Sequence, residues 1–197
     1  MDTDKHRLEK AKAALRSEIQ AKLKTLSPEE RKSNSEKLCA KLKEQSFLQS
    51  ATSILFFAPL PNEANIWPLL ESAIAGNKIV ALPCFDSDRQ IYKSRRVKNI
   101  HVEIISGQFG IREPATGCIE IPPDDLDLVL VPLVAFDLHG NRLGRGKGFY
   151  DRLLQNFRGT KCGIAFDEQI VEKIPAEKTD VRMDFILTPT RCVTAAL

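Results

Sequence analysis

Apolar residues recur at helical spacing in the first part of the chain. From about Lys5 to Leu26 they fall three, four or seven positions apart, which predicts an amphipathic helix: Leu8, Leu15, Ile19, Leu23 and Leu26. The segment Ser27–Glu30 then supplies an N-cap serine, a proline for the first turn and a capping-box glutamate. A second helix is therefore predicted to run to about Gln45, with Leu38 and Leu42 on its apolar face.

Further along, short apolar runs alternate with helical patterns. Strands are predicted at 53–57, 78–82, 90–93, 127–131, 161–166 and 184–187, and helices at 63–75 and 146–157. This alternation predicts an α/β fold with an open, partly parallel sheet flanked by helices, and with the two N-terminal helices packed on the body. At 197 residues, the whole chain, 1–197, is expected to form a single domain.

Composition is typical of a globular protein that is not embedded in a membrane. No apolar run approaches the roughly 20 residues of a transmembrane helix, and residues 1–30 show no apolar core of a signal peptide. The five cysteines are widely spaced and form no C-x-x-C pair. We therefore expect reduced thiols and a cytoplasmic protein.

The formal net charge of +3 is small, and the basic residues are spread along the chain. No aromatic residues alternate with them and no known nucleic-acid-binding motif is present, so we expect no nucleic-acid partner and no membrane partner. A small anionic ligand fits this charge better. We expect the protein to act as a monomer.

The densest chemical signal is a glycine-rich basic loop that follows the predicted strand at 127–131. Gly144, Gly146 and Gly148 alternate with Arg145 and Lys147. Glycines let the backbone come close to a ligand while the two cations flank it, which favours phosphate. The predicted helix at 146–157 would add the free N–H groups of its first turn. The spacing matches neither a Walker A loop nor a Rossmann fingerprint.

A simpler interpretation of this loop is a solvated turn with charges at a helix start. Asp151 would then offset the helix dipole or pair with Lys147 four residues earlier. His6, His101 and His139 are scattered, so a nucleophile-histidine-acid arrangement is not indicated.

Together with the predicted strand that precedes it, the segment from Pro132 to Arg152 resembles the signature of the 5-formyltetrahydrofolate cyclo-ligase family, also called methenyltetrahydrofolate synthetase. Other matches follow in the expected order along nearly the whole chain: Lys12-x-x-x-Arg16, Glu63, Phe109-Gly110-Ile111-x-Glu113-Pro114 and Asp184.

The resemblance implies a role for each matching position. ATP would be bound by Lys12, Arg16, Arg142, Gly144, Arg145, Gly146, Lys147, Gly148, Phe149 and Tyr150. The folate would be contacted by Glu63, Phe109 and Tyr150, and Mg²⁺ by Asp151 and Asp184. Arg145 and Lys147 would act as the catalytic cations, with Arg145 nearest the transferring phosphoryl group.

Some of these positions can also be judged from the residues themselves. Lys12 projects within the apolar stripe of its helix, with Arg16 at the edge, so Lys12 needs a partner; alternatively both snorkel to solvent. Alone, Glu63 would be an acid near a helix start, and Asp184 a strand-edge residue. Two positions depart from the family pattern: Phe149 stands where members often have tyrosine, and Thr179 where many bacterial members have histidine.

The implied reaction is the ATP- and Mg²⁺-dependent closure of 5-formyltetrahydrofolate to 5,10-methenyltetrahydrofolate. ATP would phosphorylate the formyl oxygen, N10 would attack, and ADP and phosphate would be released. Two rivals remain open. One is a sugar-phosphate isomerase or CoA-transferase relative that uses the loop without ATP, although Lys12 and Arg16 argue against it. The other is a non-catalytic folate buffer or RNA-contacting protein.

Overall fold

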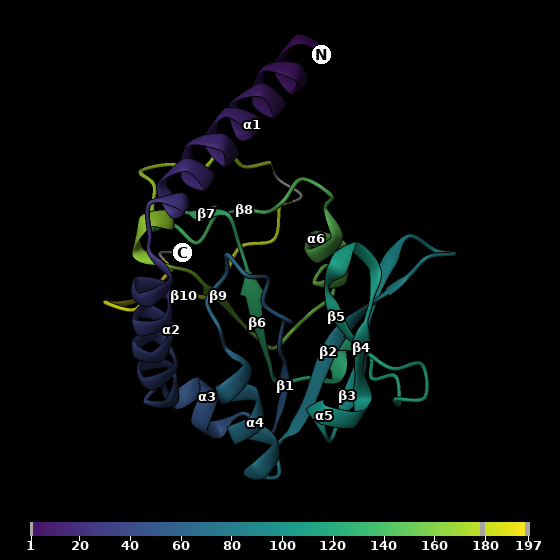
Figure 1. The fold of residues 1–197 in the computed structure, drawn as a ribbon. Helices are drawn as coiled ribbons and strands as arrows, with labels where there is room; N and C mark the ends of the chain where they lie inside the picture. The colour runs from purple at the N-terminus through teal and green to yellow at the C-terminus, as the bar shows by residue number, and fades with distance from the viewer. Residues whose placement is uncertain (1, 178–179, 196–197) are drawn as a thin grey trace.

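The structure is a computed structural model that describes residues 2–177 and 180–195; for residues 2, 3, 5 and 109 it describes the backbone alone. Both predicted N-terminal helices are confirmed as α1 (Asp2–Lys24) and α2 (Pro28–Lys43) (Figure 1). The Ser27 side chain accepts a hydrogen bond from the Glu30 N–H, and the Glu30 carboxylate accepts one from the Ser27 N–H. The sequence therefore encodes the start of α2 through a capping box.

A seven-stranded sheet forms the centre of the molecule, in the order β11-β10-β9-β6-β1-β2-β3. Neighbours from β10 to β2 run parallel, whereas β11 and β3 are antiparallel edge strands. The predicted partly parallel α/β fold is thus confirmed. The strands are β1 (Ser53–Leu55), β2 (Ile79–Asp86), β3 (Ile91–Val97), β6 (Leu128–Pro132), β9 (Thr160–Ile164), β10 (Phe185–Leu187) and β11 (Cys192–Thr194).

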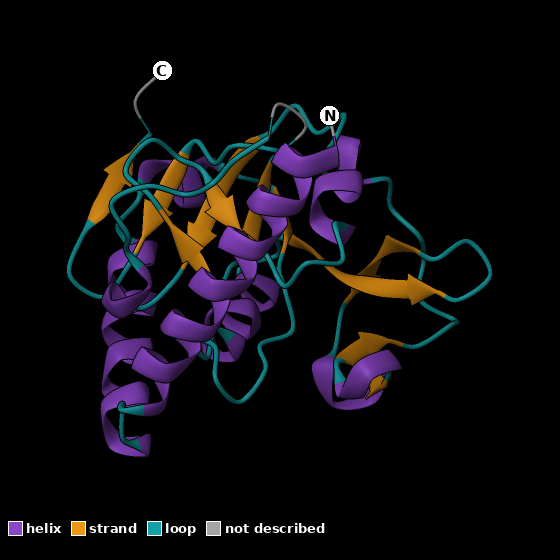
Figure 2. Cartoon of the chain, turned by 90° about the horizontal axis from the view of Figure 1, so that it is seen from above, coloured by secondary structure: helices purple, strands orange, loops and turns teal. Residues whose placement is uncertain are grey.

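Alternate residues of the central strands point to opposite faces of the sheet, as the strand period of two requires. One face packs against α1 and α2, together with α3 (Ser46–Ser50) and α4 (Trp67–Ala75), through Ile54, Val80, Leu82, Leu128 and Leu130. The other face carries Leu55, Ala81, Val129 and Val131, and packs against Leu153, Leu154 and Phe157. Figure 2 shows the N-terminal helices gathered along one side of the strands.

Shorter elements complete the chain between the strands. Two small hairpins pair β4 (Ile104–Ser106) with β5 (Arg112–Pro114) and β7 (Ala135–Phe136) with β8 (Arg142–Leu143). The remaining helical turns are α5 (Ile100–Glu103), α6 (Phe149–Leu153), and the 3-10 turns Gln108–Gly110, Pro123–Asp125 and Asp167–Gln169. All five cysteines are free thiols, as expected. Within the described residues, no helix is both long and apolar enough to cross a membrane.

Two predicted helices differ from the observed ones. The helix predicted from residue 63 begins at Trp67, with Pro68 in its first turn and the Trp67 N–H donating to the Asn65 side chain at 3.2 Å. Glu63 instead closes a turn, since its N–H donates to the Leu60 carbonyl at 2.9 Å. Proline is favoured in the first helical turn, so Pro68 was the better sequence signal for the start of α4.

The helix predicted at 146–157 is only the five-residue α6, Phe149–Leu153. Gly148 precedes it in the left-handed conformation (φ 63°), and separate turns carry Leu154 and Phe157 into the core. These turns preserve the apolar spacing that predicted a helix. The glycine-rich loop therefore precedes a short helix and not the predicted long one, so the bounds predicted for this helix are wrong.

Candidate active site

A cavity of about 460 Å³ opens at the carboxyl edge of the central parallel strands. Pro132 and Leu133 line it at the end of β6, and Phe57 and Ala58 line it just beyond the end of β1. Ligand sites of open α/β sheets lie at this edge. The other walls come from α1, the segment 60–63, the loop 142–151, and the residues Glu177 and Asp180.

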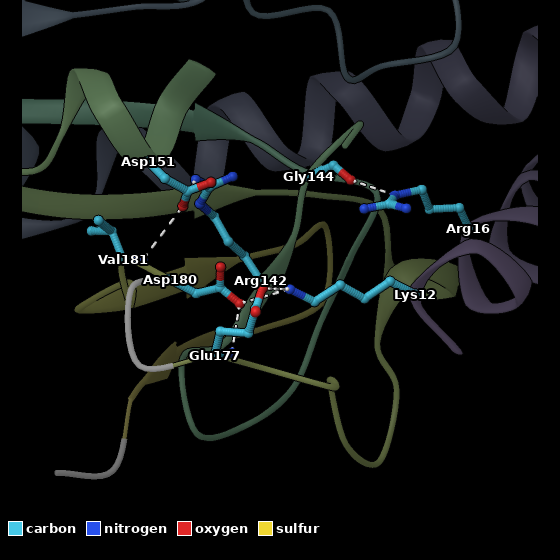
Figure 3. Close-up of polar contacts among 8 residues, drawn as sticks. All are labelled: Lys12, Arg16, Arg142, Gly144, Asp151, Glu177, Asp180 and Val181. Carbon is cyan, nitrogen blue, oxygen red and sulfur yellow. Dashed lines mark hydrogen bonds and ion pairs between the residues drawn. The ribbon is translucent and has the colours of Figure 1, made fainter. Parts of the chain in front are cut away.

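The glycine-rich loop crosses the mouth of this cavity beside α1. The Arg16 Nε–H donates to the Gly144 carbonyl at 2.9 Å (Figure 3). Gly146 has φ +93°, and a Cβ atom there would lie 3.3 Å from the Arg16 guanidinium carbon. Left-handed backbone and lack of space both favour glycine at this position. The loop is thus held close to a cation contributed from far upstream.

Lys12 is buried on the inner face of α1, with 6% of its surface exposed. Its ammonium group lies 3.0 Å from the Glu177 carboxylate and 3.1 Å from the Asp180 carboxylate (Figure 3). Burial acts to lower the pKa of Lys12, but the hydrogen bonds to Glu177 and Asp180 outweigh it, and the pKa is raised. The prediction that Lys12 faces the body and needs a partner is confirmed, and snorkelling to solvent is excluded.

Arg142 is buried behind the loop and anchors Asp151. Its Nη2 atom lies 2.5 Å from the Asp151 Oδ1 atom, which also accepts a hydrogen bond from the Val181 N–H at 3.4 Å. The guanidinium carbon lies 5.9 Å from the centre of the Tyr150 ring. Asp151 therefore pairs with Arg142 and not with Lys147, the partner that the simpler interpretation suggested.

Arg145 reaches across the cavity mouth to the segment after β1. Its Nη2 atom lies 2.7 Å from the Glu63 Oε1 atom, and the other Glu63 oxygen accepts a hydrogen bond from the Leu60 N–H at 2.9 Å. The Glu63 side chain is largely buried, whereas that of Arg145 is half exposed. Glu63 is thus fixed in the cavity wall, while Arg145 has room to move.

The cavity wall contains equal numbers of cationic and anionic side chains, but not every cation is paired with a carboxylate. The wall contains five cations, Lys12, Arg16, Arg142, Arg145 and Lys147, and five carboxylates, Glu9, Glu63, Asp151, Glu177 and Asp180. Arg16 bonds to a carbonyl rather than a carboxylate. Lys147 has no hydrogen bond or ion pair with any described residue. Two cations beside the glycine-rich loop are therefore left for an anionic ligand.

Aromatic rings form another part of the cavity wall, next to the glycine-rich loop. The rings of Tyr92 and Phe149 meet edge to face with centroids 5.0 Å apart, and Phe85 packs against both at 5.5 and 5.3 Å. Burial, and then the nearby charge of Glu63, raise the pKa of Tyr150. The cavity thus combines a cationic side, suited to phosphates, with an aromatic side, suited to a flat ring.

Most of the predicted site residues meet in this one cavity. Lys12, Arg16, Glu63, Arg142 and residues 144–151 all line it. Phe109 belongs to the 3-10 turn Gln108–Gly110, but its side chain lies outside the described part, as does Thr179. Glu177, Asp180 and Tyr92 line the cavity although sequence reasoning assigned them no role.

Asp184 is the exception. Its carboxylate accepts a hydrogen bond from the Lys161 N–H at 2.7 Å and pairs with the Lys161 ammonium group at 3.0 Å. Lys161 lies at the amino end of β9, the edge opposite the cavity. The predicted magnesium site shared by Asp151 and Asp184 is therefore corrected, because the strands separate the two carboxylates. In residues 2–177 and 180–195 no three His, Cys, Asp or Glu side chains are grouped to hold a metal ion.

Comparison with known proteins shows which family the chain belongs to. Residues 8–189 match the sequence profile of the 5-formyltetrahydrofolate cyclo-ligase family. The chain belongs to this family. The match spans α1, the glycine-rich loop and the segment of Glu177 and Asp180, so every side of the cavity lies within it. The cavity is accordingly the candidate active site of a cyclo-ligase, an enzyme of folate metabolism.

Relatives from distant organisms support the assignment. The 5-formyltetrahydrofolate cyclo-ligase of Escherichia coli K12 is 30% identical over 180 residues, which cover 88% of this chain and 97% of the relative. That of Mus musculus is 29% identical and covers 90% and 93%. The NMR structure of Aquifex aeolicus 5,10-methenyltetrahydrofolate synthetase superposes with a TM-score of 0.84 at 33% identity, covering 94% of this chain and 93% of the other. The cyclo-ligase fold and the match in sequence thus agree.

Proposed function

We propose that this cyclo-ligase uses ATP to close 5-formyltetrahydrofolate to 5,10-methenyltetrahydrofolate, releasing ADP and phosphate. The observation that carries the proposal is the two-sided cavity. Arg16 and Lys147 have no carboxylate partner among the described residues and lie at the glycine-rich loop, and Tyr92, Phe149 and Tyr150 line the same cavity with aromatic rings. Polyphosphate and a bicyclic ring are the two ligand parts that such walls suit.

The chemistry requires an activated formyl group. An amide-like N5-formyl oxygen is a poor leaving group, so the γ-phosphoryl group is transferred to it: a new O–P bond forms, the bond to the β-phosphate breaks, and ADP leaves. The N10 lone pair then attacks the formyl carbon, N10 loses its proton, and the C–O bond breaks as phosphate departs. Such a transfer asks the protein mainly for positioning and charge neutralisation.

The cations divide this work according to their mobility. Arg16 and Lys12, fixed by α1, hold the nucleotide phosphates. Arg145 and Lys147 act as the catalytic cations on the loop, where the Arg145 side chain is half exposed beside Glu63 and Lys147 has no partner among the described residues. Arg142 orients Asp151 at 2.5 Å and supports Tyr150 from behind, so it acts as a positioning residue. Glu63 contacts the folate ring.

Mg²⁺ is proposed as the ion that accompanies ATP. Protein sites for Mg²⁺ use one or two carboxylates together with substrate phosphates. Asp151 fits as a single such ligand, because its side chain lines the cavity and is 31% exposed, whereas Asp184 does not fit. When bound, the ion would neutralise charge on the phosphate oxygens.

We further propose that residues 1–197 work as one domain and as a cytoplasmic monomer. The central sheet joins strands from Ser53 to Thr194, which supports a single domain. Free thiols are usual in a reducing compartment. Gel filtration at the protein concentration of the activity assay tests whether the protein is a monomer.

The stoichiometry of the reaction tests the proposed function against its rivals. Purified protein is incubated with Mg-ATP, with and without 5-formyltetrahydrofolate, and both phosphate and methenyl product are measured. We expect one phosphate for each methenyl product and little phosphate without folate. Product without phosphate would favour an ATP-independent enzyme on this scaffold. Folate binding without turnover, or salt-sensitive RNA binding without turnover, would favour a binding module.

A further inference from the structure

Tyr92 is a cavity residue that neither the glycine-rich loop nor its neighbouring motifs include. It lies on β3 directly across from Phe85 in the antiparallel pair of β2 and β3. Its ring meets Phe85 at 5.5 Å and Phe149 at 5.0 Å, and the Tyr150 ring lies 6.4 Å away. Because rings from β2 and from α6 surround it, the Tyr92 side chain is held in one orientation before any ligand binds.

The hydroxyl group of Tyr92 has no hydrogen-bond partner among the described residues. Among the described side chains, the fully buried polar atoms without a partner are Glu113 Oε1, Arg142 Nε and Glu168 Oε2, so the Tyr92 oxygen is not fully buried. The oxygen is therefore accessible, and Tyr92 is one of the residues that line the cavity. Buried or half-buried tyrosine hydroxyls normally find a partner. This one is available to a ligand.

The chemistry of the hydroxyl suits a neutral polar atom. Burial first, and the charge of Glu113 second, raise the pKa of Tyr92 to about 12. The group thus stays protonated at neutral pH and can donate one hydrogen bond and accept others. A neutral phenol can donate to a ring carbonyl or ring nitrogen and can accept from a ring N–H.

The surroundings of Tyr92 favour the folate ring over the nucleotide phosphates. Glu63 lies in the same cavity with its side chain only 12% exposed. A carboxylate there repels phosphate but matches the adjacent N–H donors of an aminopyrimidinone ring. Ile111 and Pro83 add apolar surface for the faces of a flat heterocycle.

We infer that Tyr92 is a further substrate-contacting residue, whose hydroxyl group hydrogen-bonds a polar atom of the bicyclic ring of folate while its ring helps to form the wall on which that heterocycle packs. This inference rests on the proposed function, since it assumes that the cavity takes 5-formyltetrahydrofolate. It assigns specificity for the ring to β3, an edge strand of the sheet, in addition to the loop and α1.

The variant Tyr92→Phe tests this inference, because it removes the hydroxyl and keeps the ring contacts. Binding of 5-formyltetrahydrofolate without ATP is measured by calorimetry, together with the KM for ATP and the thermal midpoint. We expect folate binding about three- to tenfold weaker, the range for one neutral hydrogen bond. The KM for ATP and the thermal midpoint should stay unchanged, because the hydroxyl has no hydrogen-bond partner in the described part of the chain.

A matched control lies two residues away on the same strand. The Ser94 hydroxyl donates to the Ile121 carbonyl at 2.5 Å and does not line the cavity. Ser94→Ala should therefore lower the thermal midpoint and leave folate affinity unchanged, the reverse of the pattern for Tyr92→Phe.

The outcomes separate this inference from the proposed function. Wild-type folate affinity in Tyr92→Phe, with active wild-type enzyme, would overturn the assignment of Tyr92 alone. A raised KM for ATP with unchanged folate affinity would also overturn it, because the hydroxyl would then serve the nucleotide. Wild-type protein that neither binds folate nor forms product would overturn both.

Discussion

The ammonium group of Lys12 lies 3.1 Å from the carboxylate of Asp180, although 168 positions separate the two residues in the chain. The contact fixes α1 across the cavity and places a buried cation at its rim. Asp180 also accepts a hydrogen bond from the Glu177 N–H at 2.8 Å, so the segment that holds Lys12 is itself ordered by this carboxylate. Glu177 and Asp180 therefore set the position of Lys12 in the cavity wall before any ligand binds.

Lys12→Met should weaken the use of ATP much more than the binding of folate. The substitution removes a charge-assisted hydrogen bond, which is worth about 1.5–3 kcal/mol, so we expect the KM for ATP to rise by about 10- to 150-fold. Initial rates at varied ATP measure the effect. Lys10→Met, at an exposed position of the same helix, is the matched control. Equal KM values for ATP in both variants would exclude Lys12 from the nucleotide site.

Arg145→Ala should lower turnover more than folate affinity. We expect kcat to fall by about 100-fold or more, as when a group that stabilises charge in the transition state is removed. Folate binding should change far less, because Glu63 keeps its hydrogen bond from the Leu60 N–H. Single-turnover rates and equilibrium folate binding separate the two effects. Arg158→Ala, an exposed arginine outside the cavity, controls for net charge. Unchanged turnover in Arg145→Ala would remove Arg145 from the chemistry.

Gly146→Ala tests the shape of the loop. A side chain at φ +93° costs about 1–3 kcal/mol, and the new methyl group would also press against Arg16. We expect the KM for ATP to rise by about tenfold, while the sheet and its thermal midpoint change little. At Gly117 an added Cβ would meet nothing within 4 Å and φ is not positive, so Gly117→Ala should behave as wild type. Wild-type kinetics in Gly146→Ala would show that the loop does not need its left-handed residue.

Asp127→Asn should lower stability at neutral pH and have no effect in strong acid. Hydrogen bonds from the Thr52 side chain first, and from the Thr52 and Ser53 backbone, lower the pKa of Asp127 to about 2. Because the folded pKa lies below the unfolded value, the stabilisation is present above about pH 4 and disappears as pH falls towards 2.

The size of this effect is limited by solvent. The full shift would correspond to roughly 2.5 kcal/mol, but Asp127 is exposed, so we expect about 1 kcal/mol. Urea unfolding at pH 7 and at low pH measures it. Asp125→Asn, whose carboxylate has no hydrogen bond to a described residue, is the control. If Asp127→Asn lowered the free energy of unfolding as much at pH 2 as at pH 7, the stabilising role of the Asp127 carboxylate would be contradicted.

Local signals in the sequence predicted local structure well. The capping box at Ser27 and the apolar positions Leu38 and Leu42 define α2, and the buried position of Lys12 follows from its place in the apolar stripe. Strands of the parallel core were located because both of their faces are buried, which leaves continuous apolar runs. The antiparallel edge strand β11, with a short and partly exposed run, was not predicted.

What the sequence could not supply is contact between distant segments. Nothing in local spacing links Lys12 to Glu177, or turns Tyr92 towards the loop, since tertiary packing alone brings these pieces together. The same limitation explains Asp184, whose place at the amino edge follows from the direction of β10. The error in helix 146–157 was avoidable, because glycines at 146 and 148 disfavour a helix start there.

The absorption of the methenyl product is the most direct test of the central claim. Purified protein is mixed with 5-formyltetrahydrofolate and Mg²⁺, and near-ultraviolet absorption is followed before and after ATP is added. We predict that the methenyl chromophore appears only after ATP, at a rate that Lys12→Met reduces at limiting ATP. A chromophore that forms equally well without ATP, or none at all from folded protein that binds both ligands, would contradict the account.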